Sequence, residues 1–268
     1  VHGDKSNIHL FKYPPLAYYL LGLNITIVKP LIHSPDFFAN LSDIHSYPNW
    51  FAKPGIFQSL FFLKLIYLIF DILLIYLIAR LFAGYYQSAL IKFWAFSPLI
   101  IYSTYMYGQF DIIPVFFIVS ALFFFKNENY DLSIAMLSIA GMLKHFPFLL
   151  LPFFLIFTPA RLVVKPRLIA IAIIPYILLS TPFLTTRSFY SDVLLNSSEY
   201  LRGANAFIII YSLLIISAFI FGRNHNNKFR LLVSFSFLTL SAYLIAAQFH
   251  PQFIIWICPF LLIFLTEY

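Results

Sequence analysis

Polar side chains in short turns between long apolar segments are the residues most able to act on a substrate. Asp111 stands in one such turn, 107–111, where a carboxylate at the mouth of a membrane span is costly unless it is solvated or paired. The turn therefore predicts either a solvated acid or N-cap, or a carboxylate of a functional site. Lys144 and His145 occupy a second turn, where they can bind a phosphate, although the lysine can equally reach the headgroup level as an ordinary membrane anchor.

A third turn carries His250 and Gln252, and Trp256 follows within the next helical turn as an expected aromatic-belt anchor. Asp71 differs because it lies inside an apolar helix, and Lys64 is too far along that helix for a direct pair. We expect Asp71 to be structural and hydrogen-bonded to a neighbouring helix. The candidate catalytic residues are Asp111 and Gln109, and the candidate substrate-binding residues are Tyr13, Tyr107, Lys144, His145, Arg187, Arg202, His250 and Gln252.

The composition is that of a membrane protein. Of the 268 residues 62% are apolar and only 10% are charged, which leaves too little charge to cover a soluble domain. The net charge of +7 is spread between apolar segments, so it indicates membrane topology and no nucleic-acid partner. A single cysteine, Cys258, excludes a disulfide framework and a zinc site built on several cysteines.

The apolar segments predict an all-α, polytopic bundle of about nine membrane-spanning helices. The long apolar segment 131–160 is divided in two, because Pro147 removes a helical donor and disfavours helix in the residue before it. The chain begins with Val1 and ends directly after an apolar segment, so we expect a fragment that lacks at least one preceding helix. The predicted spans are 56–80, 87–107, 110–126, 131–144, 147–160, 167–184, 205–222, 230–248 and 252–267.

The basic residues orient these spans. With residue 55 outside the cell or in a lumen, nine Lys and Arg residues fall in the short inner connections, as the positive-inside rule expects. Segment 14–32 is then better interpreted as a juxtamembrane helix in the interface than as a tenth span. We therefore divide the chain into residues 1–55, the end of a first outer loop, and residues 56–268, the transmembrane bundle, and seek function at the outer face.

Several segments, in this order, resemble the GT-C superfamily of integral-membrane glycosyltransferases. Within it the chain is most similar to the mannosyltransferases that add the first mannose to the GPI anchor, and to archaeal and bacterial relatives that use polyprenyl-phosphate sugars. The segments that carry the resemblance begin at Tyr13-Pro14-Pro15, Phe70-Asp71, Phe93-Trp94, Tyr107-Gly108-Gln109-Phe110-Asp111, Met142-Leu143-Lys144-His145-Phe146-Pro147 and His250-Pro251-Gln252.

The resemblance implies transfer of a mannose-like hexose from polyprenyl or dolichyl phosphate to a lipid, glycan or protein acceptor on the extracytoplasmic face. No cofactor is required by the residues, and use of a divalent cation stays open. Such enzymes carry an essential Asp early in the first outer loop, and Asp4 does not match it, so we expect that residue upstream of Val1. The alternatives are a transporter or lipid flippase, which would favour inverted repeats that the sequence does not show, and a non-catalytic membrane scaffold.

Overall fold

The structure is a computed structural model that describes residues 13–32, 55–81, 87–159, 161–185, 189, 193, 203–246 and 250–267. These residues are helical and contain no strand, which confirms the predicted all-α class. The helices, in chain order, are α1 (Pro15–Val28), η1 (Lys29–Leu31), α3 (Ile56–Leu81), α4 (Gln87–Ala95), α5 (Pro98–Ile100), η3 (Ile101–Met106), α6 (Ile112–Lys126), α7 (Tyr130–Leu143), η4 (Phe146–Leu150), α8 (Leu151–Phe157), η5 (Leu162–Val164), α9 (Lys165–Ser180), η6 (Thr181–Phe183), α10 (Ala204–Asn224), α11 (Lys228–Ala246), η9 (Pro251–Trp256) and α12 (Cys258–Glu267).

Four described helical segments are long and apolar enough to cross a membrane, namely Ile56–Leu81, Leu162–Phe183, Ala204–Gly222 and Lys228–Ala246. Three shorter apolar helices, Ile112–Lys126, Tyr130–Leu143 and Phe146–Phe157, lie between the first two of these in the sequence. The structure therefore supports an integral membrane protein, while the count of nine spans stays a prediction. The predictions about residues 33–54, Arg187 and Arg202 lie outside the described residues.

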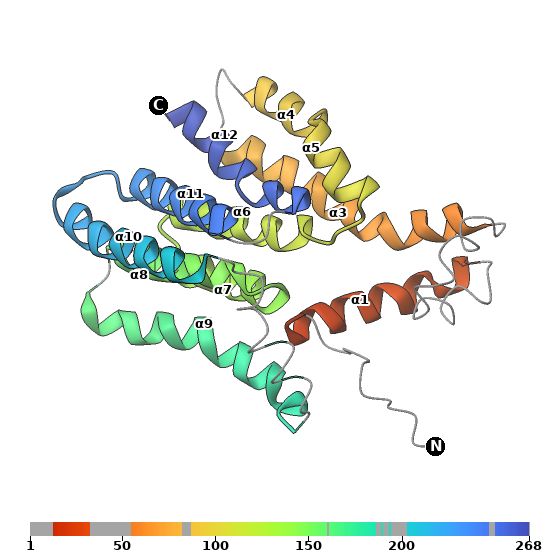
Figure 1. The fold of residues 1–268 in the computed structure, drawn as a ribbon, viewed down its shortest axis with the longest axis horizontal. Coiled ribbons are helices and arrows are strands. Elements are labelled where there is room, and N and C mark those ends of the chain that lie inside the picture. The colour runs from red at the N-terminus through yellow and green to blue at the C-terminus, as the bar shows by residue number, and fades with distance from the viewer. Residues whose placement is uncertain are drawn as a thin grey trace.

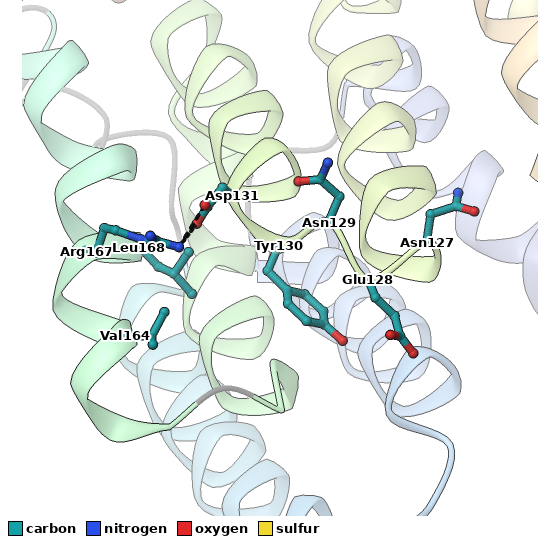
Figure 2. Close-up of a pocket in the computed structure, with 8 residues that line it drawn as sticks. All are labelled: Asn127, Glu128, Asn129, Tyr130, Asp131, Val164, Arg167 and Leu168. Carbon is teal, nitrogen blue, oxygen red and sulfur yellow. Dashed lines mark hydrogen bonds and ion pairs between the residues drawn. The ribbon is translucent and has the colours of Figure 1, made fainter.

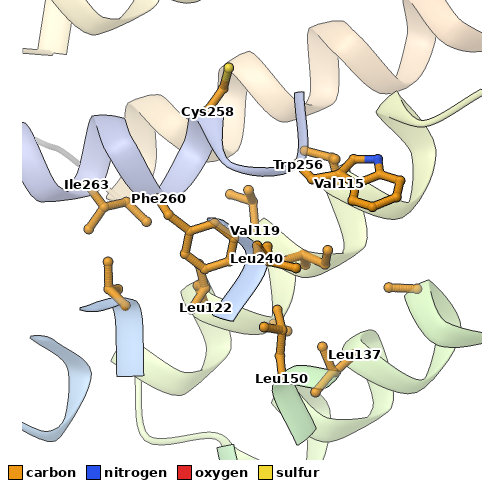
Figure 3. Close-up of a cluster of buried hydrophobic side chains, with 14 of the residues drawn as sticks. Val115, Val119, Leu122, Leu137, Leu150, Leu240, Trp256, Cys258, Phe260 and Ile263 are labelled. Atoms are coloured by element: carbon orange, nitrogen blue, oxygen red, sulfur yellow. The ribbon is translucent and has the colours of Figure 1, made fainter. Parts of the chain in front are cut away.

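The helices pack in two layers (Figure 1). One layer contains α4, α3, α6, α7 and α9 in spatial order, and the other contains α12, α11 and α10 with α8 beneath them. Within the first layer α6 is buried on nearly every side, so it forms the centre of the bundle. Figure 3 shows this core, in which Phe260 of α12 and Leu240 of α11 lie close to Val119 and Leu122 of α6.

Hydroxyl groups join the central helices through short bonds. Ser133 Oγ donates to the Ala121 carbonyl at 2.8 Å, which joins α7 to α6, and Ser138 Oγ donates to the Ala172 carbonyl at 2.7 Å, which joins α7 to α9. Small residues at such crossings let apolar helices approach closely where no hydrophobic effect drives them together.

Proline positions decide where several helices break. The predicted division of segment 131–160 is confirmed, because α7 ends at Leu143 and Lys144 is extended, with φ −148° and ψ 147°. The prediction of one continuous helix over 87–107 is wrong. There α4 ends at Ala95, Ser97 is extended before Pro98, and the chain continues as α5 and the π-helix η3. The cause is the same, since proline lacks an N–H donor and disfavours helix in the residue before it.

A single glycine permits the close approach of α7 and η4. A Cβ at Gly141 would lie 2.5 Å from the Phe148 ring, whereas a Cβ at Gly22, on α1, would meet nothing within 4 Å. We expect Gly141→Ala to lower the free energy of unfolding by about 1–3 kcal/mol through overpacking. Gly22→Ala is the control, and it should leave stability unchanged or raise it by up to about 1 kcal/mol. Thermal unfolding in detergent measures both, and equal midpoints for the two variants would show that the Gly141 contact is not tight.

Candidate functional site

Asp111 and Lys144 form a buried ion pair at the end of the bundle where α6 begins and α7 ends. Lys144 Nζ lies 2.6 Å from Asp111 Oδ1, and the two side chains are 11% and 2% exposed. Asp111 stands at the N-cap position of α6, yet its side chain makes no capping bond there. The interpretation of Asp111 as a solvated acid is therefore wrong, and although Asp111 occupies the N-cap position its carboxylate does not cap α6. The interpretation of Lys144 as a headgroup anchor is also wrong.

A tryptophan from the far end of the sequence completes this pair. Trp256 Nε1 donates to the same Asp111 oxygen at 2.8 Å, and the indole is 3% exposed and stacks on Phe146 with ring centroids 3.8 Å apart. Trp256 is thus not the aromatic-belt anchor that the sequence suggested. Asp111 Oδ1 accepts two donors, while Asp111 Oδ2 is buried and has no hydrogen-bond partner among the described residues.

Aromatic rings surround the Lys144 ammonium. Its Nζ lies between 5.2 and 5.7 Å from the centroids of four rings, close enough for cation–π attraction. The rings touch in two pairs, because Tyr13 packs edge-on against Phe110 with ring centroids 5.0 Å apart, and Phe253 stacks on Trp256 with ring centroids 4.3 Å apart. The four rings are those of Tyr13, Phe110, Phe253 and Trp256.

His145 turns away from this cluster. Its Nε2 lies 2.9 Å from the Tyr176 hydroxyl of α9, and burial lowers its pKa from 6.5 to about 4. His145 lies in the turn between α7 and η4, outside the four candidate spans. It is therefore uncharged at neutral pH and cannot supply the positive charge that we expected it to offer a phosphate.

The other predicted site residues in the described part of the chain are Gln252, His250, Tyr107 and Gln109. Gln252 is 4% exposed, and its Oε1 has no hydrogen-bond partner in the described part of the chain. His250 packs against Phe253 with ring centroids 5.2 Å apart, which places it at the edge of the aromatic cluster. Tyr107 is 50% exposed, and among the described residues the hydrogen bonds of the Asp111 side chain come from Lys144 and Trp256 and not from Tyr107 or Gln109.

Asp71, near the middle of α3, is the centre of a second polar cluster. Trp94 Nε1 donates to Asp71 Oδ1 at 2.8 Å, and the Tyr105 hydroxyl donates to Asp71 Oδ2 at 2.6 Å. This confirms the predicted hydrogen bonds between Asp71 and neighbouring helices. Both buried aspartates accept an indole N–H at the same distance, but both oxygens of Asp71 are engaged, whereas Asp111 keeps one free acceptor. That difference favours Asp111 as the residue that meets a substrate.

A separate pocket lies at the opposite end of α6 and α7 (Figure 2). It has a volume of about 430 Å³ and combines the turn from Asn127 to Asp131 with the start of α9. Arg167 Nη2 donates to both oxygens of Asp131 at 2.8 Å, and both side chains are about half exposed or more. Solvated pairs of this kind are common on surfaces and contribute little energy. The buried cluster at Asp111 is the stronger candidate.

The donor set around Asp111 does not suit a divalent cation. The Lys144 ammonium stands 2.6 Å from Asp111 Oδ1 and would repel a second positive charge. Among the described residues, no three His, Cys, Asp or Glu side chains lie close enough together to hold a metal ion.

The structure also adds residues that the sequence did not single out. Tyr67 of α3 lies close enough to Asp111 for an electrostatic interaction, and Phe110 and Phe253 form part of the ring around Lys144. The one available signal was local, since each phenylalanine lies within three residues of a polar candidate in its turn.

Comparisons of the chain with known protein families, curated proteins and solved structures found no match. Function is therefore inferred from the geometry of the site.

Proposed function

We propose that the protein is a polytopic membrane glycosyltransferase of the GT-C type. It would transfer a mannose-like hexose from a polyprenyl or dolichyl phosphate to a lipid, glycan or protein acceptor at the extracytoplasmic face. The observation that carries this proposal is the convergence of four separate segments on the Asp111–Lys144 pair. Tyr13, Phe110, Phe146 and Trp256 bring those segments together, and each segment belongs to the pattern that resembles GT-C enzymes.

Such a reaction replaces one oxygen at the anomeric carbon by another. The acceptor oxygen bonds to that carbon, the bond to the lipid phosphate breaks, and the phosphate leaves with the electron pair. The hydroxyl proton passes to a carboxylate base, which must lie within hydrogen-bond reach of the hydroxyl. Asp111 Oδ2 is a buried acceptor with no partner among the described residues, so it can receive a substrate hydroxyl. Lys144 and Trp256 hold the other oxygen and fix the carboxylate in place.

The retention of a buried ion pair favours a functional role. Desolvating two charges costs several kcal/mol per ion, and apolar residues of similar volume often stabilise a protein at least as well. A carboxylate that must be charged and oriented for a substrate gives a reason to keep the pair. The aromatic rings around it can stack on a sugar ring or flank a prenyl chain.

Transfer itself is the decisive measurement. Membranes containing the full-length protein are incubated with a polyprenyl phosphate that carries a radiolabelled hexose, and labelled product is compared with membranes lacking the protein. We expect product that requires both the protein and the lipid-linked donor. Movement of the intact donor across vesicles, without any transfer, would instead establish the transporter or flippase alternative.

We propose nine alternating spans with the site outside, and contacts at the opposite end of the bundle agree with that alternation for three of the helices. At the opposite end of the bundle Lys126 Nζ reaches the Leu81 carbonyl at 3.2 Å and lies 5.3 Å from the Phe229 ring centroid. The predicted inner ends of α3, α6 and α11 therefore meet, as alternating spans require. Lys and Arg in short loops favour the cytoplasmic side.

Cysteine labelling tests this orientation, and the single native cysteine, Cys258, is buried. Tyr107→Cys and Asn127→Cys both place a thiol at an exposed position, one at each end of the bundle. A membrane-impermeant reagent should label the first in intact cells and the second only after permeabilisation, because the two positions face opposite sides. The reverse pattern would invert the orientation, and labelling of both in intact cells would contradict the alternating spans.

A further inference from the structure

Lys64 lies in the apolar helix α3 and has no counter-charge among the residues that the structure describes. An 18-residue stretch of this helix has a mean hydropathy of 2.4, and the Lys64 ammonium donates one hydrogen bond, to the Tyr105 carbonyl at 2.7 Å. No carboxylate lies within ion-pair distance of Lys64 among the described residues. An ammonium group has three donors, so Lys64 retains two for another ligand.

The Lys64 side chain lies against the turn that carries Asp111. A Cβ at Gly108 would stand 3.1 Å from Lys64 Cε and 3.3 Å from Lys64 Nζ, and Gly108 has a φ of +77°. A side chain at position 108 would therefore press on the ammonium as well as strain the backbone. The absence of a side chain at Gly108 leaves the ammonium close to the backbone of the turn.

The same face of α3 also reaches Asp111. Tyr67 lies three residues after Lys64, which is about one turn and about 4.5 Å along the helix, and Tyr67 interacts electrostatically with Asp111. Asp71 follows on that face and bonds the Tyr105 hydroxyl, while Lys64 bonds the Tyr105 carbonyl. Lys64 therefore lies on the face of α3 that interacts with Asp111, and its hydrogen bond to the Tyr105 carbonyl joins it to η3.

Lys64 differs in its charge from Lys144 and His145, the two residues that the sequence suggested for binding a phosphate. Lys144 is paired with Asp111 at 2.6 Å, and burial lowers the pKa of His145 to about 4, which leaves its ring neutral at pH 7. Of these three described residues, only Lys64 brings an uncompensated positive charge to this end of the bundle. A lysine binds phosphate as a point charge through charge-assisted hydrogen bonds.

We propose that Lys64 binds the phosphate group of the lipid-linked sugar donor, beside Gly108 and within a helical turn of Tyr67. This inference rests on the proposed function, because the donor is taken to be a polyprenyl phosphate. The phosphate lies at the level where α3 passes the 107–111 turn, and the sugar it carries then faces Asp111. Lys144 stays with Asp111 and orients the carboxylate.

Binding of a short-chain polyprenyl phosphate that carries no sugar tests the assignment in purified full-length protein. Lys64→Gln should weaken binding about tenfold or more, because it removes a hydrogen bond to a charged group, whereas Lys64→Arg should retain most of the affinity. The matched control is Lys92→Gln on α4, which makes the same charge change at an exposed position. Equal affinities for Lys64→Gln and the control would overturn the proposal.

Three further measurements identify the ligand and cover the case in which the variant does not fold. The corresponding neutral polyprenol should bind equally to wild type and Lys64→Gln. Competition by inorganic phosphate or phosphatidylglycerol as strong as by polyprenyl phosphate would overturn the assignment to the donor. If Lys64→Gln does not fold, a photoreactive polyprenyl phosphate on wild-type protein decides, since cross-links should map near Lys64 or to 107–111 and their confinement to other segments would refute the site.

The inference and the proposed function can fail separately. Binding that depends on Lys64 without sugar transfer would leave the phosphate site standing and remove the transferase. Transfer that proceeds while Lys64→Gln binds the lipid phosphate normally would keep the transferase and move the phosphate elsewhere.

Discussion

Asp111→Asn is expected to lower hexose transfer about 10²-fold or more in membranes containing the full-length protein. Asparagine keeps the size of the side chain, and its amide oxygen can still accept the Trp256 N–H, but it removes the charge that holds Lys144 and replaces the free acceptor at Oδ2 with an NH2 donor. The measurement is transfer of radiolabelled hexose from polyprenyl phosphate, normalised to the amount of folded protein.

Asp71→Asn is the matched control for this prediction. Asp71 and Asp111 are both buried, and each accepts an indole N–H at 2.8 Å, but Asp71 spends its second oxygen on the Tyr105 hydroxyl. Asp71→Asn should therefore lower the yield of folded protein while leaving the specific activity of what remains. Unchanged specific activity in Asp111→Asn would refute the site, and loss confined to Asp71→Asn would transfer the role to the Asp71 cluster.

Lys144→Met is expected to lower the free energy of unfolding by about 3–5 kcal/mol, because it leaves the Asp111 carboxylate buried without a counter-charge. Methionine fills most of the space among the surrounding rings, so the loss reports charge more than volume. Thermal or denaturant unfolding in detergent micelles provides the measurement.

The double variant Lys144→Met, Asp111→Asn separates charge from packing. It removes both charges, so most of the stability lost in Lys144→Met should return, although transfer should not. If the double variant is as unstable as the single one, the rings and not the ion pair account for the loss. If Lys144→Met is itself as stable as the wild type, the ion pair is not maintained in the folded protein.

The sequence alone determined the class of protein and much of its segmentation. A chain that is 62% apolar with 10% charged residues can cover its surface only with lipid, so a helical membrane bundle follows from composition. Pro147 divided segment 131–160 as predicted, because its effect on the helix is local. Pro98 acts in the same local way on segment 87–107, so the break after Ala95 also has a signal in the sequence.

The sequence also indicated Asp71, Asp111 and Lys144, because a charged residue among apolar segments must find a partner. It could not say which partner each one has. Trp256 lies 145 residues from Asp111, and its pairing depends on how η9 docks against α6. The same docking turned an expected interfacial anchor into the donor that fixes a carboxylate.

Tertiary packing alone decided which of the candidate cations carry usable charge. Lys144 is neutralised by a residue 33 positions away, and His145 is made neutral by burial beside α9. Lys64 becomes a candidate for phosphate binding because the 107–111 turn packs against its side chain. Among the described residues its ammonium bonds the Tyr105 carbonyl and has no carboxylate partner. Hydropathy and helix propensity act over a few residues, whereas the charge state and partners of a side chain depend on neighbours that only the folded chain brings together.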